Sequence, residues 1–351
     1  MKIKVLKFGG TSVGSVEAIK RSANIICDWS KKSKVIVVLS AMSGETDRLI
    51  NLTKSFSKSP NPVDFDNAIS TGENLSCALM SIYLNNQKIK SKSLHSWQIP
   101  IMTSSEHMKS RILSINKNFL LNELENLDVL VVPGFQGINE RREITTLGRG
   151  GSDTSAVAVA AAMDAECIIY TDVEGVFTTD PNIVPNAKKI NKISYEEMLE
   201  LASQGAKVLQ TRSVELAMRK NTKLSVRSSL KPKKIGTIIT DEKSVLEKNT
   251  VSGIAYTKDE AKITLSRVLD KPGVSSKIFG PLAKGNINVD MILQNISQDG
   301  KFANLSFTLP RADLEKALKI LKKEKSKIGY KKIISSNNIS KRDRCTRHGR
   351  S

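Results

Sequence analysis

The sequence predicts an open, mainly parallel α/β sheet with helices on both faces, followed by a smaller α+β domain. Up to Thr240, short apolar runs alternate with stretches in which apolar residues recur every three or four positions, as in alternating strands and helices. Some runs, such as 35–39, are continuous and β-branched, which is typical of strands buried on both faces. From residue 261 onward the order is strand, helix, strand, strand, helix, which favours a separate compact domain.

The first domain is expected to span residues 1–245. It begins with a strand at 3–8, and Ser15 then caps a helix whose apolar positions follow the 3.6-residue repeat. The run 35–39 is the next strand. Further along, we expect strands at 129–132 and 167–170, a helix at 153–163, and a helix that a capping box at 194–197 opens and that ends at Ser203.

The second domain is expected to span residues 246–334, after a linker near 240–250. Its predicted strands are 251–256, 261–268, 287–293 and 304–309, and its predicted helices are 274–284 and 313–323. Past Lys323 the apolar pattern fades, with only a short strand at 331–334. Residues 335–351 are therefore expected to form a basic, disordered tail.

The positive charge is concentrated near the end of the chain. The 351 residues include 55 Lys and Arg against 35 Asp and Glu, a net charge of +20, and eleven of these bases lie in 322–351 beside two acids. Only 5% of residues are aromatic, so no stacking platform for bases is indicated. We expect a solvated lysine-rich surface and no specific nucleic-acid partner. A nucleic-acid binder would instead show salt-sensitive binding that depends on residues 335–351.

No membrane segment or export signal is predicted. The longest apolar run is 156–163, whereas spanning a bilayer takes about 18 residues, and Lys7 interrupts the apolar N-terminus. We therefore expect a cytoplasmic protein with no membrane partner.

The four cysteines lie far apart without neighbouring histidines, so neither a zinc site nor a disulfide is predicted; they are Cys27, Cys77, Cys167 and Cys345.

Two glycine-rich turns carry the groups that suggest chemistry. In the first, Lys7 ends a predicted strand, and the glycines at 9–10 let backbone N–H groups approach a phosphate. In the second, Arg149 and two glycines precede Asp153 at a helix start, where a guanidinium can clamp a carboxylate. Taken singly, the first is a structural turn and Asp153 a helix cap. Two such turns at carboxyl ends of strands together favour a bound phosphate or carboxylate.

Seven segments of the chain occur in the order in which aspartate kinases carry them. They are KFGGTSV at 7–13, SAMSGETD at 40–47, TGE at 71–73, GFQG at 134–137, TTLGRGGSD at 145–153, YTDVEGVFTTDP at 170–181 and GAK at 205–207. The sequence thus resembles the aspartate kinase family from residue 2 to about residue 334.

The resemblance implies the amino-acid-kinase fold and transfer of the γ-phosphoryl group of ATP to the side-chain carboxylate of L-aspartate. The products are 4-phospho-L-aspartate and ADP, in the first step towards lysine, threonine and methionine, with Mg²⁺ bridging the phosphates. Two catalytic residues are implied: Lys7 offsets charge on the transferred group, and Asp153 orients the lysine. No protein ligand to a metal is implied.

The implied aspartate site must match two carboxylates and one ammonium group. Arg149 is expected to clamp a carboxylate and Glu73 to pair with the ammonium. The other expected contacts with aspartate are Ser40, Thr46 and Ser152.

The resemblance also implies the nucleotide contacts. Those around the phosphates are Lys7, Phe8, Gly9, Gly10, Ser12 and Lys207. Those around the adenosine are Tyr170, Thr171, Asp172, Val176, Phe177, Thr178, Thr179, Asp180 and Pro181. Without the resemblance, the 180–181 step is only a turn and Lys207 only a lysine at a helix start.

The second domain resembles an ACT regulatory domain through LDKPGV at 269–274 and GNINVDMILQN at 285–295. The resemblance implies an effector, lysine or threonine, bound at a dimer interface near Asp270 and Asn288. A homodimer is therefore expected.

The chain departs from the family near its end. Such aspartate kinases continue into a second ACT domain, whereas 342–351 holds no apolar residue besides Cys345. We expect a disrupted gene or reading frame, one strand of an incomplete second ACT domain, and an unpaired strand edge at 251–256.

Competing interpretations of the function are a catalytically silent amino-acid sensor and another kinase of the same fold. Lys7, Arg149 and Asp153 together disfavour the sensor, and Glu73 favours an amino acid over a nucleotide as acceptor.

Overall fold

A computed structural model describes residues 2–99, 101–148, 150–206, 208–241, 251–285, 287–297 and 301–346. By its internal contacts the chain divides into two compact units. One unit comprises the described residues up to Ile254 together with 344–346, and the other is Ala255–Asp343. The linker predicted near 240–250 lies largely outside the described residues.

The first unit contains a large sheet and the helices that pack on it. The strands of this sheet are β1 (Ile3–Phe8), β2 (Lys34–Leu39), β3 (Ser91–Ser93), β6 (Val129–Pro133), β9 (Glu166–Thr171), β10 (Lys192–Ser194), β11 (Leu224–Ser228) and β12 (Thr237–Thr240). The helices are η1 (Gly10–Ser12), α1 (Val16–Ser30), α2 (Glu45–Phe56), α3 (Pro62–Ile69), α4 (Thr71–Asn86), α5 (Lys117–Glu125), α6 (Gly151–Ala162), α7 (Tyr195–Ser203) and α8 (Thr211–Lys220).

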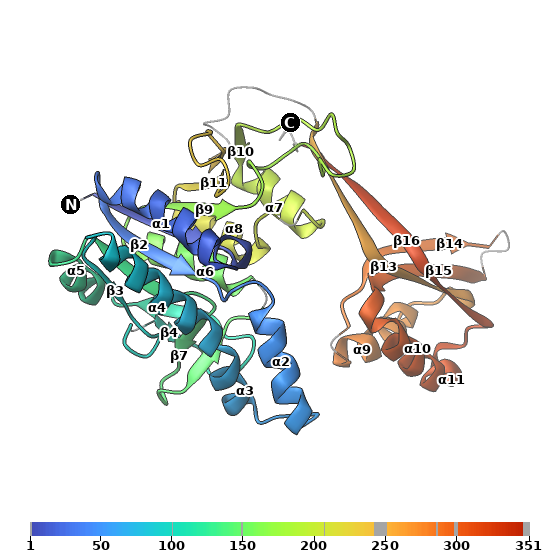
Figure 1. Cartoon of the computed structure of the whole chain (residues 1–351). Coiled ribbons are helices and arrows are strands. Elements are labelled where there is room, and N and C mark those ends of the chain that lie inside the picture. Colours follow the sequence, from blue (N-terminus) through green and yellow to red (C-terminus); the bar gives the residue numbers. More distant parts are fainter. Residues whose placement is uncertain are drawn as a thin grey trace. The chain divides into compact units, whose positions relative to one another are not determined.

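The large sheet is mainly parallel, as the sequence predicts. Its strand order is β10-β12-β11-β9-β1-β2-β6-β3 (Figure 1). Among its described pairs, only β11 and β12 run antiparallel. β1 lies between β9 and β2, so its carboxyl end is at the centre of the sheet edge where the loops meet.

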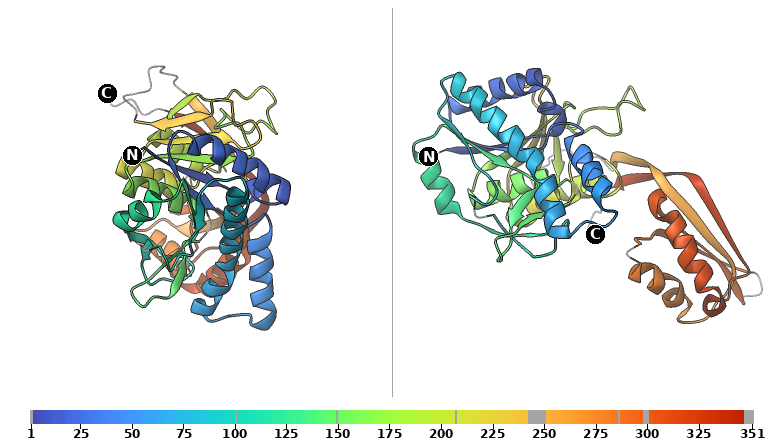
Figure 2. Two further views of the ribbon diagram at one scale, coloured as in Figure 1. Left: turned by 60° about the vertical axis from the view of Figure 1, so that its left-hand side comes forward. Right: turned by 60° about the horizontal axis from the view of Figure 1, so that its bottom comes forward.

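Alternate residues of the central strands face opposite helix layers. Leu6 and Phe8 belong to a core cluster with apolar residues of α1 and α4, such as Ile26 and Met80, whereas Val5 does not. This is the two-residue alternation of a strand covered on both sides. Helices lie on both faces of the sheet in Figures 1 and 2, and α6 packs on β1 and α8.

Two helix starts confirm the predicted caps. The hydroxyl of Ser15 accepts a hydrogen bond from the N–H of Ala18 at 3.2 Å and begins α1. At α7, the hydroxyl of Ser194 accepts from the N–H of Glu197, and the Glu197 carboxylate accepts from the N–H of Ser194. This reciprocal pair is the capping box that the sequence predicts.

A second, smaller sheet flanks the large one in the first unit. It contains β4 (Ile101–Thr103), β5 (Ile112–Ile115), β7 (Gln136–Ile138) and β8 (Ile144–Thr146), in the order β5-β4-β7-β8. Strands of three or four residues are too short to display an alternating pattern, so the sequence does not predict this sheet.

The second unit follows the predicted order of elements. Its elements are β13 (Val251–Leu269), α9 (Val274–Lys284), β14 (Asp290–Ile296), β15 (Phe302–Pro310), η3 (Arg311–Asp313), α10 (Leu314–Lys323), α11 (Lys325–Ile328) and β16 (Lys332–Thr346). The first residues of β13 and the last residues of β16 count with the first unit. The strand order is β14-β15-β13-β16. Leu282 of α9 and Leu321 of α10 are fully buried in one core with Phe307 of β15, so both helices pack on one face of this sheet.

Two predictions for the second part of the chain are wrong. The two strands predicted at 251–256 and 261–268 form one continuous strand, β13, and the disordered tail predicted from residue 335 is a strand, β16, as far as Thr346. β16 is a neighbour of β13 in this sheet. Backbone hydrogen bonds hold an edge strand without an apolar side-chain pattern, and the sequence therefore gives no signal for it.

None of the helices in the described ranges combines the length and apolarity needed to cross a bilayer. Cys27, Cys77 and Cys167 are free thiols. Cys77 and Cys167 are buried, as expected for small apolar side chains.

Candidate active site

A cavity of about 690 Å³ lies in the first unit, at the carboxyl ends of β1, β2 and β6. Its walls are the loops that follow these strands and the first turns of α2, α4 and α6. Ligands of open parallel sheets bind at this edge, because the loops and the helix N-termini converge there. The position is the one predicted from the two glycine-rich turns.

Lys7 and Asp153 form an ion pair at the floor of this cavity. Lys7 is the penultimate residue of β1, Asp153 lies in the first turn of α6, and the distance from Nζ to Oδ1 is 2.6 Å. Both side chains are 12% exposed. A carboxylate that contacts the ammonium group in such a shielded place fixes where the positive charge sits.

Two glycines allow the loops to close around the ion pair. A Cβ at Gly10 would lie 3.0 Å from the carbonyl oxygen of Ala41, and a Cβ at Gly134 would lie 2.8 Å from Cβ of Ser152. Side chains at these positions would push the loop after β2 and the start of α6 away from their present places. The glycines are thus explained by close approach of backbone.

Glu73 is a buried acid in the first turn of α4 and faces the same cavity. Its residue is 3% exposed, and Oε1 accepts a hydrogen bond from the N–H of Ala41 at 3.1 Å. Oε2 is buried and has no hydrogen-bond partner among the described residues. Burial raises the pKa of this carboxyl to about 8, against the lowering effect of the Ala41 N–H. The site therefore holds an acid that lacks one partner.

The other predicted aspartate contacts gather around these groups. Ser40 follows β2, Thr46 lies in α2 and Ser152 in α6, and all three line the cavity with Lys7, Glu73 and Asp153. Arg149 lies outside the described residues. The structure thus brings together residues from four separate segments of the sequence.

The residues predicted around the phosphates are placed in three different ways. Gly10 lines the cavity, and Gly9 precedes the short helix η1. Phe8 is fully buried and stacks on Tyr170 with ring centroids 4.9 Å apart. The hydroxyl of Ser12 donates to the hydroxyl of Ser229 at 2.9 Å, and Ser12 is 1% exposed. Lys207 lies outside the described residues.

The stretch predicted to hold the adenosine forms the end of β9 and the loop after it. Tyr170 is 1% exposed and its hydroxyl accepts from the indole N–H of Trp29 at 2.9 Å, so its side chain faces the core. Val176 is likewise buried. The remaining members are at least partly exposed; they are Thr171, Asp172, Phe177, Thr178, Thr179, Asp180 and Pro181.

In the second unit, the two predicted effector contacts are exposed. The carboxylate of Asp270 accepts a hydrogen bond from the side-chain amide of Gln294 at 3.0 Å, at the beginning of the turn into α9. Asn288 lies between α9 and β14 and is exposed. The two residues therefore lie at opposite ends of α9, one before it and one after it.

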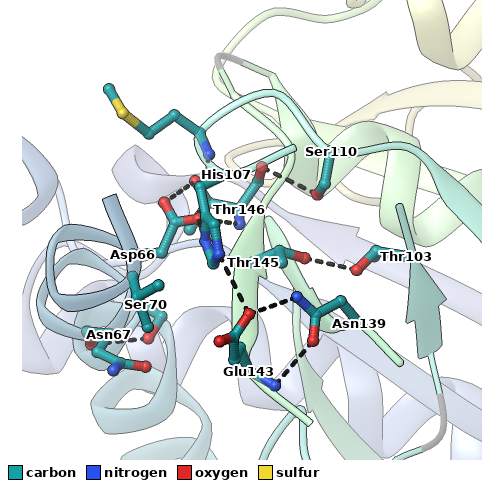
Figure 3. A network of polar contacts seen from close by, with 12 residues as sticks. Asp66, Asn67, Ser70, Thr103, His107, Ser110, Asn139, Glu143, Thr145 and Thr146 are labelled. Carbon is teal, nitrogen blue, oxygen red and sulfur yellow. Dashed lines mark hydrogen bonds and ion pairs between the residues drawn. The ribbon is translucent and has the colours of Figure 1, made fainter. Parts of the chain in front are cut away.

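Several residues that support the cavity are not predicted from the sequence. The carboxylate of Asp66, fully buried in α3, contacts His107 and Thr146 in the network shown in Figure 3. From the other side, the guanidinium of Arg212 donates to the carbonyl oxygens of Leu147 at 2.7 Å and of Ser110 at 3.1 Å. These partners are 41 to 102 positions apart in the chain, so no local pattern marks them.

Two family models match the chain. The amino acid kinase family matches residues 2–228, and an ACT domain matches residues 266–324. An aspartate kinase of Pseudomonas putida is 47% identical over 344 residues, which are 97% of this chain and 83% of that protein. The chain belongs to the aspartate kinase family. It is a kinase with the amino-acid-kinase fold and a C-terminal ACT domain, as the sequence predicts.

Other aspartate kinases are also similar to this chain over most of its length. Aspartokinase 2 of Bacillus subtilis is 42% identical over 97% of this chain and 83% of its own length. The crystal structure of aspartate kinase from Synechocystis has 39% identity and a TM-score of 0.61, and the match covers 97% of this chain and 59% of that one. Aspartokinase III of Escherichia coli, solved with lysine and aspartate, has 25% identity and a TM-score of 0.76 over 95% of this chain and 85% of its own.

The described part of this aspartate kinase contains no metal site formed by protein side chains alone. No three or more His, Cys, Asp or Glu side chains there are grouped so that they could hold a metal ion. Asp153, the carboxylate at the floor of the cavity, is already paired with Lys7.

Proposed function

We propose that this aspartate kinase transfers the γ-phosphoryl group of ATP to the side-chain carboxylate of L-aspartate and releases 4-phospho-L-aspartate and ADP. This is the first step towards lysine, threonine and methionine. The observation that carries the proposal is the presence, in one cavity, of a shielded Lys7–Asp153 ion pair and the buried, incompletely partnered Glu73. The first suits a transferring phosphoryl group, and the second suits an amino-acid ammonium group.

The chemistry requires positioning and charge neutralisation rather than a general base. The attacking group is a carboxylate, which has no proton to lose. Lys7 offsets the negative charge that three phosphoryl oxygens and the incoming carboxylate bring together. Asp153 holds the ammonium group of Lys7 in place from a distance of 2.6 Å. The burial of both side chains strengthens their interaction with charges in the cavity.

Recognition of aspartate uses both signs of charge. An ammonium group within reach of Glu73 Oε2 would give that buried atom its missing partner and would favour the ionised carboxylate. We assign the clamping of a substrate carboxylate to Arg149, and further contacts to Ser40, Thr46 and Ser152. The cavity lining supports the last three assignments.

For the nucleotide, we propose that the glycine turn at 9–10 and Lys207 contact the phosphates and that exposed parts of 171–181 contact the adenosine. Phe8, Ser12, Tyr170 and Val176 can take part only through the backbone, because their side chains face the interior. Mg²⁺ would be held largely through the phosphates of ATP, as in other phosphoryl-transfer sites. When bound it supplies charge neutralisation.

We propose the ACT domain as the site of an effector, lysine or threonine, near Asp270 and Asn288 of a homodimer in the cytoplasm. Aspartokinase III of Escherichia coli, which was solved in complex with lysine and aspartate, supports an amino-acid effector. A test is the effect of each amino acid on turnover. Inhibition by lysine or threonine that Asp270→Ala relieves would support the assignment, and inhibition that Asp270→Ala leaves unaltered would contradict it.

The proposed reaction is tested by trapping the product with hydroxylamine, which converts an acyl phosphate into a coloured hydroxamate. We expect ATP-dependent hydroxamate with L-aspartate and none with L-glutamate, and no ADP release with uridine monophosphate as acceptor. ATP binding without turnover by a folded chain would support the competing view of a catalytically silent amino-acid sensor. ADP release with the nucleotide acceptor alone would support another kinase of the same fold.

A further inference from the structure

Asp66 is a buried carboxylate that the proposed reaction does not use. It lies in α3 with its side chain fully buried, and it does not line the cavity. Its neighbours in the helix, Phe65 and Ile69, do line it. A carboxylate costs free energy to bury unless it is well hydrogen-bonded, so its place directly behind the cavity wall requires an explanation.

Four donors converge on this carboxylate from two other segments of the chain (Figure 3). Oδ2 accepts from Nδ1 of His107 at 2.9 Å, from the N–H of Met108 at 3.0 Å and from the N–H of Thr146 at 3.0 Å. Oδ1 accepts from the hydroxyl of Thr146 at 2.7 Å. A carboxylate offers only acceptors, and hydrogen bonds to an ionised group are about twice as strong as neutral ones. Asp66 therefore fastens both segments to α3.

The two segments that Asp66 joins form one wall of the cavity. Met108, Thr146 and Gly148 line it together. The segments also touch each other, because a Cβ at Gly148 would lie only 3.0 Å from the carbonyl oxygen of Met108. Thr146 stands at the end of β8, directly before the loop that leads to Ser152 and Asp153 in α6. A shift of Thr146 would therefore be passed on to the substrate side of the cavity.

His107 is itself held from both sides. Its Nε2 lies 3.5 Å from Oε2 of Glu143, and its side chain is 12% exposed. Glu143 in turn accepts from the side-chain amide of Asn139 at 2.8 Å. The imidazole thus bridges Asp66 to the turn between β7 and β8, which keeps Nδ1 directed at Asp66.

We infer that Asp66, with His107, is a positioning residue for the amino-acid substrate, because its carboxylate fixes the wall formed by Met108, Thr146 and Gly148. The inference rests on the proposed function and adds residues that do not touch substrate. The nucleotide stretch at 171–181 has no contact with Asp66, His107 or Thr146 among the hydrogen bonds of the described residues. Because the loop after Thr146 leads to Ser152, which we assign to aspartate, we expect the effect of Asp66 to fall mainly on aspartate.

The test is a comparison of Michaelis constants for Asp66→Asn and Asp64→Asn. In Asp66→Asn, one acceptor oxygen is replaced by an amide NH2 that faces other donors. We expect the KM for aspartate to rise about tenfold or more and the KM for ATP to change less than about twofold. Asp64 is exposed in the same helix, so the same chemical change there should leave both constants as they are.

A second pair of variants keeps the test decisive if Asp66→Asn does not fold. His107→Ala removes the Nδ1 donor, and His107→Asn replaces it with an amide donor at a similar distance from the backbone. We expect His107→Ala to raise the KM for aspartate about threefold or more and His107→Asn to restore most of this loss. A purely structural role would instead raise the KM for aspartate and the KM for ATP together.

The outcomes separate this inference from the proposed function. An unaltered chain without aspartate-dependent turnover overturns both. Turnover with equal aspartate KM in the unaltered chain and in folded Asp66→Asn, or with equal rises in both Michaelis constants, overturns the inference alone. If Asp66→Asn is unfolded, an unchanged aspartate KM in His107→Ala overturns it.

Discussion

The ammonium group of Lys7 lies 2.6 Å from Oδ1 of Asp153, although the two residues are far apart in the chain. β1 and α6 meet at this point because β1 is a central strand and α6 packs on it. The pair places one positive charge at the floor of the cavity and holds it with one negative charge that is already in position.

Asp153→Asn is predicted to lower kcat about tenfold or more while the protein stays folded. The amide keeps the shape of the carboxylate but no longer holds the Lys7 ammonium by charge. Steady-state turnover with saturating ATP and aspartate measures this. Asp164→Asn is a matched control, since Asp164 is an exposed aspartate just after the same helix. Equal kcat for the two variants would contradict the role of the ion pair.

The efficiency of aspartate use is predicted to rise with pH up to about 8 and then to level off. Burial raises the pKa of Glu73 to about 8, so the carboxyl is protonated in the free protein at neutral pH and must lose its proton to pair with an ammonium group. A profile of kcat/KM for aspartate between about pH 6 and about pH 9 measures this. Glu73→Gln should flatten the profile and lower its plateau; a profile with the same rise in the variant would contradict the assignment.

Glu73 also makes the stability of the folded protein depend on pH. Because the folded state binds the Glu73 proton more tightly than the unfolded state, this group's contribution to folding is greatest below its ordinary pKa of 4.5 and is lost as pH rises through about 8. In the absence of substrate, Glu73→Gln should therefore gain stability relative to the unaltered chain as pH increases over this range. Chemical unfolding of both proteins across the range measures the difference.

Gly150→Ala is predicted to destabilise the first unit more than Gly44→Ala. Both glycines have positive φ, +71° and +79°, but a Cβ at Gly150 would lie 1.8 Å from Cγ of Gln210, whereas a Cβ at Gly44 has nothing within 4 Å. The Gln210 side chain caps α8 by accepting from the N–H of Arg212. We expect an extra loss of about 1–3 kcal/mol, measured by chemical unfolding. Equal losses would contradict the close packing.

Arg212→Lys is predicted to lower the free energy of unfolding by about 1–2 kcal/mol. The guanidinium donates to two carbonyl oxygens on different segments, and a lysine ammonium group lacks the planar fork that does so. Thermal unfolding measures the loss. Arg219→Lys, an exposed position of the same helix paired with Glu215, should change little. A larger loss of stability in Arg219→Lys than in Arg212→Lys would contradict the stabilising role of the two Arg212 hydrogen bonds.

The regular parts of the fold could be predicted because their signals are local. β1 at 3–8 and α9 at 274–284 have the predicted bounds, and the capping box of α7 forms as expected. The sequence does not predict the sheet of β4, β5, β7 and β8, and it wrongly predicts disorder where most of β16 lies. These strands depend on pairing with distant segments, and backbone pairing leaves little trace in side-chain periodicity.

The residues of the candidate site could be predicted only where they lie in recognisable sequence motifs. Lys7, Glu73 and Asp153 lie in recognisable segments, and they line one cavity. Asp66 and Arg212 lie in ordinary helical contexts, and only the fold brings them to Thr146 and Leu147. Conversely, the hydroxyl groups of Ser12 and Tyr170 make hydrogen bonds to other side chains of the protein, and a sequence motif does not show this.

The rate of the phosphoryl-transfer step in Lys7→Ala tests the proposed chemistry most directly. A single-turnover experiment with saturating ATP and aspartate separates this step from binding and product release. Lys20→Ala is the matched control, because Lys20 is exposed on α1. We predict a fall of about a hundredfold or more for Lys7→Ala and no change for Lys20→Ala. A Lys7→Ala variant that folds, binds both substrates and transfers the phosphoryl group within about twofold of the unaltered rate would contradict it.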